Sequence, residues 1–136
     1  MWKIYALLSA VFAALTAIFA KVGIQNVDSN LATAIRTVVI LFVAFGIVFV
    51  TGTHAQIPNI TKKCWIFLTL SGLSTGASWL FYFRAIQLGK VSEVAVIDKF
   101  SLVLTIIFAA VFLHEGLSIK TVAGALLMTA GTILLL

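Results

Sequence analysis

The sequence predicts an all-α polytopic membrane protein with five transmembrane helices. Hydrophobic residues make up 62% of the 136 positions and charged residues only 10%, whereas about a quarter of a soluble domain is charged. A soluble monomer of this length could not bury so much apolar surface. The apolar residues also fall into five runs, each long enough at about 1.5 Å per residue to cross a hydrocarbon core of about 30 Å.

Cap residues and loop lengths separate these runs. Glycines suited to a left-handed C-cap follow four of them, and polar residues suited to N-caps precede three. The predicted spans are Ile4–Val22, Leu31–Thr51, Cys64–Leu88, Glu93–Glu115 and Ile119–Leu136. The predicted C-caps are Gly23, Gly52, Gly89 and Gly116, and the predicted N-caps are Asn30, Ser92 and Ser118. The only proline, Pro58, lies in the longest loop, so we expect no proline-kinked span. Short loops after the third and fourth spans predict antiparallel neighbours.

Several function classes lack the residues that they need. The single Cys64 cannot form an internal disulfide, and the scattered lysines and arginines form no basic patch of the kind that binds nucleic acid. No phosphate-binding glycine loop, metal-spaced Cys/His set or nucleophile elbow is present. His54 and His114 lie in separate predicted loops and are interpreted as solvated rather than as metal ligands. We therefore expect no enzyme activity, no cofactor, no metal and no nucleic-acid partner.

The distribution of cations bears on membrane orientation. Five spans place the two termini on opposite sides. One side carries Lys3, Lys62, Lys63 and Lys120, and the other carries Lys21, Arg36, Arg84, Lys90 and Lys99. The positive-inside rule orients a membrane protein by an excess of lysine and arginine on one side, and here the two sides carry almost equal numbers. One alternative is that another signal fixes a single orientation. The other is that both orientations insert, and two opposed copies would then form an inverted-repeat homodimer.

Four charges form a predicted polar layer. Arg36, Arg84, Asp98 and Lys99 each lie roughly 8–10 Å inside a helix end on the same side of the membrane. Lysine and arginine can snorkel to the surface, but the short aspartate cannot. Adjacent helical residues diverge by about 100°, so Asp98 is predicted to pair with Arg36 or Arg84 rather than with Lys99. The layer fixes helix packing, forms a positively charged substrate vestibule, or anchors lipid.

Two helix faces add to this layer. Ser71, Thr75, Ser78 and Tyr82 share one face of the third span, with Trp79 beside it. Such a face suits a polar pathway, but equally suits hydroxyls bonded to their own i−4 carbonyls. In the last span, Gly124 and Gly131 are seven residues apart and are predicted at a dimer interface, because a terminal helix has fewer neighbours in its own chain.

The order and spacing of these features resemble a known family. Residues 79–135, from "WLFYFRAIQLGK" through "FLHEGLS" to the helix with two glycines, resemble the C-terminal half of an EamA domain of the drug/metabolite transporter (DMT) superfamily. The segments "ALLSAVFAALTAIFAKVGIQ" and "ATAIRT" fit the N-terminal half of the same domain. The chain departs from close relatives at Val96, where proline is common, and at His114, where glycine is common. The missing proline predicts a straighter fourth helix.

The resemblance implies a single EamA-like transmembrane domain over residues 1–136, one half of a ten-helix inverted-repeat DMT fold. It implies a small transporter or exporter of polar metabolites in the prokaryotic plasma (inner) membrane, working as an antiparallel homodimer by alternating access. The four-helix small multidrug resistance proteins are similar but carry an acid in their first helix, which this chain lacks. The predicted substrate is anionic or zwitterionic. The alternative is a non-transporting membrane subunit that assembles with another protein. The predicted pathway residues are Arg36, Ser71, Thr75, Ser78, Trp79, Tyr82, Arg84, Asp98 and Lys99.

Overall fold

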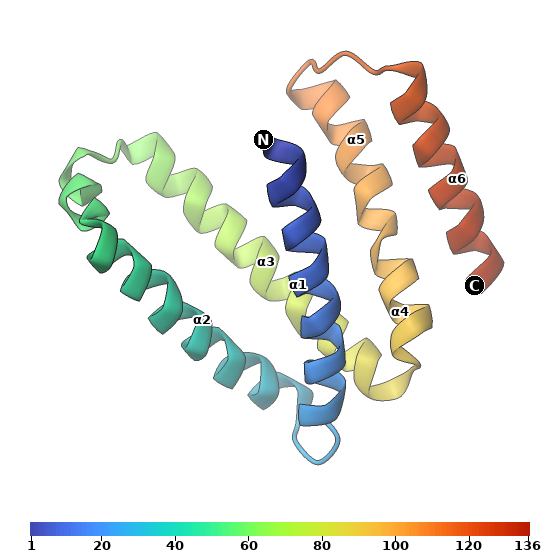
Figure 1. Ribbon diagram of the computed structural model, residues 1–136, viewed down its shortest axis with the longest axis horizontal. Coiled ribbons are helices and arrows are strands. Elements are labelled where there is room, and N and C mark those ends of the chain that lie inside the picture. Colours follow the sequence, from blue (N-terminus) through green and yellow to red (C-terminus); the bar gives the residue numbers. More distant parts are fainter. The chain divides into compact units, whose positions relative to one another are not determined.

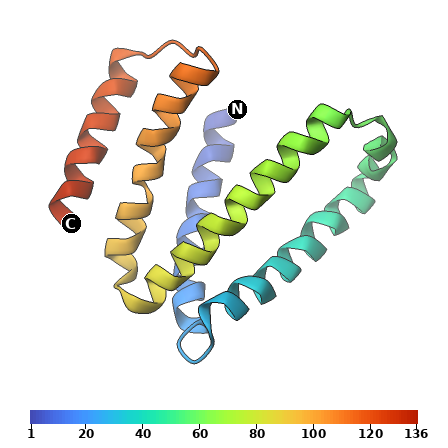
Figure 2. The same ribbon diagram turned by 180° about the vertical axis from the view of Figure 1, so that it is seen from behind.

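The computed structural model describes residues 1–136 and contains only helices (Figure 1; Figure 2 gives the view from behind). Its elements are α1 (Trp2–Gly23), α2 (Ser29–Thr51), the 3₁₀-helix η1 (Thr53–Asn59), α3 (Lys62–Leu88), α4 (Val91–Asp98), α5 (Phe100–Phe112) and α6 (Ile119–Leu135). The all-α class is confirmed, and each predicted span matches a helical segment to within three residues at either end.

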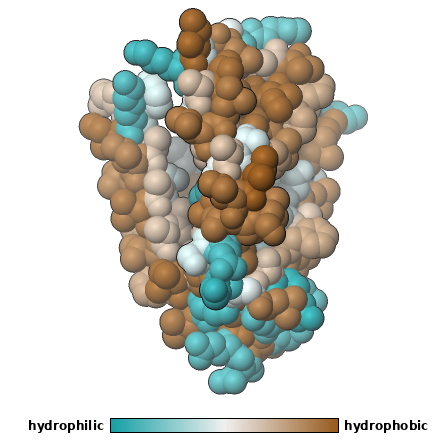
Figure 3. Space-filling model, turned by 90° about the vertical axis from the view of Figure 1, so that its right-hand side faces the viewer, coloured by the Kyte–Doolittle hydropathy of each residue, from teal (hydrophilic) through white to brown (hydrophobic).

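Four segments are long and apolar enough to cross a membrane: α1, α2, α3 and the stretch Val91–Phe112 that contains α4 and α5. The fifth, α6, has 17 residues, which is the lower limit of the usual length for a spanning helix. Four spans are therefore present by length and composition, and the fifth stays a prediction. On the face drawn in Figure 3, apolar side chains cover most of the surface. Extensive exposed apolar surface is typical of a protein that contacts a membrane.

Residues 19–87 form one compact unit. It contains the last turn of α1, together with α2, η1 and nearly all of α3. Its small core consists of Ile24, Phe83 and Ile86, each 2% exposed or less. Gln87 Nε2 donates to the carbonyl oxygens of Ile24 at 3.3 Å and Val27 at 3.0 Å. These bonds fix the turn between α1 and α2 to the C-terminal end of α3.

The caps of α2 agree only in part with the predictions. Asp28, not Asn30, is the N-cap, and its Oδ1 accepts from the backbone N–H groups of Asn30 at 2.9 Å and Leu31 at 3.3 Å. The prediction of Asn30 is wrong because α2 begins two residues earlier than expected, at Ser29, and Asp28 reaches its first free N–H groups. Gly52 is confirmed as a left-handed C-cap, with φ 72° and its N–H donating to Phe49 O at 3.2 Å. Pro58 lies in η1, outside the apolar helices.

The second unit contains residues 1–18 and 88–136. Both α4 and α5 pack against α6, and the antiparallel arrangement predicted for the last two spans is confirmed (Figure 1). Ser118 is confirmed as the N-cap of α6, because its Oγ accepts from Thr121 N at 3.1 Å. The prediction of Ser92 is wrong: Lys90 occupies the N-cap of α4, without a side-chain hydrogen bond.

Left-handed backbone is found at Gly52 and at His114. Gly23 and Gly116 have no positive φ, so the left-handed caps predicted at these two glycines are wrong, while the cap predicted at Gly89 stays a prediction. After α5 the left-handed residue is instead His114, with φ 55°. This is the position where the resemblance led us to expect glycine, which adopts that conformation without steric cost.

The apolar stretch Val91–Phe112 is interrupted where α4 ends at Asp98 and α5 begins at Phe100. The N–H of Lys99 is shared between Ala95 O at 3.3 Å and Val96 O at 3.1 Å, and Leu102 N donates to Lys99 O at 3.0 Å. The i→i−3 bonds show a tightening toward 3₁₀ geometry. The interruption arises without proline, next to a weak helix former, aspartate. The straighter helix expected from the missing proline stays a prediction.

Candidate substrate-binding groove

Arg36 joins α2 to α3 through two aromatic rings. Its guanidinium carbon lies 4.2 Å from the ring centroid of Trp79 and 5.0 Å from that of Phe83. Trp79 and Phe83 are one helical turn apart and therefore lie on the same face of α3. Arg36 and Trp79 are half-buried, while Phe83 is buried. A cation over such rings is favourable, particularly when it is partly shielded from water, so Arg36 contributes to the packing of the two helices.

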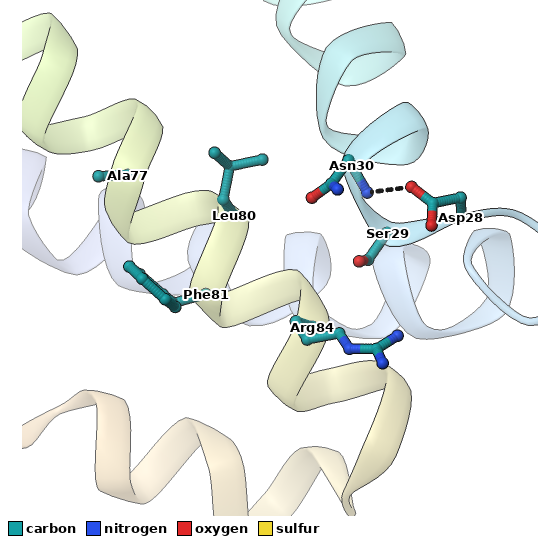
Figure 4. A pocket seen from close by; sticks show the side chains of 7 residues that line it. All are labelled: Asp28, Ser29, Asn30, Ala77, Leu80, Phe81 and Arg84. Atoms are coloured by element: carbon teal, nitrogen blue, oxygen red, sulfur yellow. Dashed lines mark hydrogen bonds between the residues drawn. The ribbon is translucent and has the colours of Figure 1, made fainter.

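A groove of about 530 Å³ opens between the start of α2 and α3 (Figure 4). On α3 its lining residues recur at spacings of three, one and three, which places them on one helical face. Residues from the cap and first turn of α2 lie opposite. The lining residues are Asp28, Ser29, Asn30, Ala77, Leu80, Phe81 and Arg84.

Arg84 supplies the positive charge of this groove. Its Nη1 donates to Gln87 Oε1 at 3.0 Å, and Gln87 in turn donates to two carbonyls of the turn before α2. The guanidinium carries five N–H donors, so this single bond orients the side chain and leaves other donors for a ligand. A helix pair with a groove, an oriented cation and a nearby carboxylate can bind a small polar molecule.

Comparison with known proteins places this architecture in a family. The EamA-like transporter family matches residues 1–136, the whole chain. The chain belongs to the EamA-like transporter family. It is also 52% identical over 134 residues to the "Uncharacterized transporter in cobO 3'region" of Sinorhizobium sp., an alignment that covers 98% of this chain and 95% of the relative. No solved structure matches the chain. The chain is thus a multi-pass membrane protein of a transporter family, which implies a small-molecule substrate and a lipid bilayer.

The hydroxyl face predicted on α3 does not line the groove of this EamA-like chain. Thr75 Oγ1 donates to Ser71 O at 2.9 Å, so the alternative of i−4 bonding is confirmed for Thr75. Ser71 and Ser78 are exposed, and neither is a groove residue. The role of this face as a pathway stays a prediction.

Asp98 and Lys99 are paired with each other, contrary to the prediction. Lys99 Nζ lies 3.9 Å from Asp98 Oδ2. The prediction assumed a continuous helix, whereas the helix is interrupted at these residues and the long lysine stem can fold toward its neighbour. The side chain of Lys99 remains 54% exposed and that of Asp98 37% exposed. An ion pair so open to solvent contributes little to stability. A partnership of Asp98 with Arg36 or Arg84 would join the two units and stays a prediction.

Gly124 and Gly131 lie on α6, and both are partly buried. A Cβ at either position would meet no atom within 4 Å. Close packing inside this EamA-like chain therefore does not require glycine at these positions. The predicted dimer interface stays a prediction.

Of the seven residues that line the groove, only Arg84 was predicted, and the three other polar ones were missed at the level of sequence. Asn30 was interpreted only as a helix cap, and Asp28 and Ser29 were given no role. The available signal was a run of three small polar residues, "DSN", directly before the apolar part of α2. A second signal was the spacing of Ala77 and Arg84 on α3, seven residues apart and hence on one face.

Proposed function

We propose that this EamA-like chain is a non-enzymatic transporter, an exporter of small polar metabolites in a prokaryotic plasma (inner) membrane. The observation that carries the proposal is the groove between two membrane-length helices, with Arg84 in its wall and Arg36 on the same helix pair. Permanent cations inside membrane helices are costly, and they commonly mark substrate pathways. A groove of this size matches the about 300–1,000 Å³ of small-molecule sites.

The proposed working unit is an antiparallel homodimer of five-helix domains, each spanning residues 1–136. Every residue of α2 from 37 to 47 is exposed, so this length of the helix needs lipid or a second copy as a neighbour. The relative is of similar length, since the alignment covers 95% of it. Two opposed copies would create an inverted repeat, the architecture on which many transporters build alternating access. Gly124 and Gly131 on α6 are the proposed contact between copies.

Transport by purified protein in liposomes tests the proposal. Liposomes loaded with a defined mixture of amino acids, organic acids and amines would be analysed by mass spectrometry of the external medium over time. We expect efflux with the wild type and with Lys120→Gln, a matched loss of a cation on α6, but not with Arg84→Gln. Absence of efflux for every class, with the dimer intact by cross-linking, would favour the non-transporting subunit instead.

Dual topology has its own test. In a Cys64→Ala background, Leu136→Cys provides a single C-terminal thiol that a membrane-impermeant reagent can label. We expect labelling from both sides of the membrane, because the cations are nearly balanced between the two sides. Labelling from one side alone would refute the antiparallel arrangement.

A further inference from the structure

We propose that the middle of α3 forms a contact between two antiparallel copies of the chain. Ser71, Ser74 and Ser78 (the serine face) would hydrogen-bond across a two-fold axis that lies in the membrane plane. The inference rests on the proposed homodimer and names an interface for it, in addition to the contact proposed on α6. It gives these hydroxyls a role other than the predicted pathway.

The serine face is not covered by the chain. Spacings of three and four residues place its members on one side of α3. Every residue of α3 from 62 to 75 is exposed, and so is Ser78. The contact of α3 with Arg36 lies elsewhere, because Phe83 is nine residues from Ser74 and hence on the opposite side of the helix. In a membrane, the neighbour of the serine face is therefore lipid or another protein chain.

The hydroxyls of the serine face favour a protein neighbour. Thr69 Oγ1 donates to Trp65 O at 2.8 Å, and Thr75 Oγ1 donates to Ser71 O at 2.9 Å, a common arrangement for hydroxyls inside membrane helices. None of the three serine hydroxyls makes a hydrogen bond. An unpaired hydroxyl in hydrocarbon is costly. Lipid tails offer it no partner, whereas a second helix with hydroxyls does.

The serine face also lies at the middle of its span. Residues 64–83, between Lys63 and Arg84, contain no charged residue. A helix of this length is about 30 Å long, the thickness of the hydrocarbon core, and its midpoint lies between Leu73 and Ser74. In an antiparallel dimer the two-fold axis lies in the membrane plane, so a helix can cross its own copy only at the midplane. The serine face has the depth that such a crossing requires.

The sequence around this midpoint is self-complementary when two copies run antiparallel. An axis between Ser74 and Thr75 sets Ser71 of each copy opposite Ser78 of the other, and Ser74 opposite Thr75. Each hydroxyl then faces another hydroxyl, which can donate as well as accept. Serine and threonine are also small enough for two membrane helices to approach closely. A contact between identical chains across a two-fold axis requires this kind of self-complementarity, so the occupant that fits the serine face is a second copy.

Disulfide cross-linking in native membranes tests the register. In a Cys64→Ala background, oxidation of Ser74→Cys should give a covalent dimer, because two thiols beside the axis are offset by only about 2 Å along the helices. Ser71→Cys alone and Ser78→Cys alone should give none, because each is about 10 Å along the helix from its own copy, beyond the reach of a disulfide. When these two variants are expressed together, they should cross-link to each other.

Thr69→Cys expressed together with Leu80→Cys is the matched control. These two positions have the same register about the axis but lie on the other side of α3, so they should not cross-link. The inference is overturned if neither Ser74→Cys nor the pair of Ser71→Cys with Ser78→Cys gives a dimer. It is also overturned if Ser71→Cys and Ser78→Cys each cross-link alone, as in a parallel dimer, or if the control pair cross-links as strongly as the Ser71 and Ser78 pair.

Dimer affinity gives a second measurement. Energy transfer between labelled copies in liposomes would be followed as the protein is diluted with lipid. Ser74→Leu should weaken the dimer at least about tenfold, because a leucine beside the axis holds the two helices apart. Thr69→Leu makes a similar enlargement on the other side of α3 and should leave the affinity unchanged. Equal effects of the two substitutions would contradict the proposed interface.

Flux measurements separate this inference from the proposed function. If the expected cross-links form but no solute crosses the membrane, the transport proposal fails and the α3 interface stands. If solutes are exported and the C-terminal thiol is labelled from both sides, but the serine positions do not cross-link, the α3 interface fails and the proposed transporter stands.

Discussion

The contact of Arg36 with two aromatic rings predicts an energetic coupling between α2 and α3. The guanidinium lies 4.2 Å from the Trp79 ring and 5.0 Å from the Phe83 ring. A cation–π contact stabilises by about 0.5–1 kcal/mol when exposed and by about 2 kcal/mol when desolvated. Because Arg36 is half-buried, an intermediate value of about 1 kcal/mol is expected for the closer ring, Trp79.

A double-mutant cycle isolates the interaction energy of Arg36 with Trp79 from the other effects of each substitution. Arg36→Met keeps most of the apolar stem and removes the charge, and Trp79→Leu keeps an apolar residue and removes the ring. The free energy of unfolding would be measured in mixed micelles by titration with a denaturing detergent for the wild type, both single variants and the double variant. We expect a coupling energy of about 1 kcal/mol, with the double variant less destabilised than the sum of the two single ones.

A second double-mutant cycle, between two residues that are not in contact, serves as the control. Arg84 makes its side-chain hydrogen bond with Gln87 and has no ring contact, so the cycle of Arg84→Met with Trp79→Leu should couple by less than about 0.5 kcal/mol. If the coupling energy of Arg36 with Trp79 is no larger than that of this control, the contact of Arg36 with the ring does not stabilise the packing of α2 against α3.

Three further substitutions test local features in the same unfolding assay. Gly52→Ala forces an alanine into left-handed backbone and should destabilise by about 1 kcal/mol; Gly116→Ala, where φ is not left-handed, is the control, and equal effects would contradict the explanation. His114→Gly should stabilise by about 0.5–1 kcal/mol, because it relieves φ 55°; a loss of stability would show that the imidazole makes a more valuable contact. Gln87→Leu leaves two loop carbonyls without their donor and should cost about 1–2 kcal/mol; a neutral effect would mean that water replaces the amide.

Hydrophobicity and length made the helices predictable. The apolar runs ended where charged and polar residues began, so each predicted span matches a helical segment to within three residues at either end. The caps were less predictable, because a cap depends on which side chain reaches the free N–H groups. Ser118 reaches these groups in α6 as predicted, whereas in α2 Asp28 reaches them in place of Asn30. A glycine after a helix permits a left-handed turn but does not impose one. Gly116 is accordingly not left-handed, and the left-handed residue after α5 is His114.

The candidate groove was predictable only in part. Depth along the helix identified Arg84, one of the groove residues, as a cation near the end of a span. The groove itself requires the turn between α1 and α2 to lie against α3, which Gln87 fixes through hydrogen bonds to backbone carbonyls. Such side-chain-to-backbone contacts over 60 or more positions in the chain leave no periodic signal in the sequence. Asp28 and Ser29 were missed for this reason.

The pair of Asp98 and Lys99 gives a measurable distinction between a surface contact and a buried partner. As the pair stands, at 3.9 Å and with both side chains more than a third exposed, it should contribute about 0–1 kcal/mol. Asp98→Asn is therefore expected to lower the free energy of unfolding by less than about 1 kcal/mol, and Lys99→Gln by a similar amount. A carboxylate paired with a cation of another helix inside the bilayer behaves differently, because removing one partner leaves the other charge buried at a cost of about 3–5 kcal/mol. A loss of that size for Asp98→Asn, relieved by adding Arg36→Gln or Arg84→Gln, would refute the surface description and establish the interhelical partner that residue depth predicted.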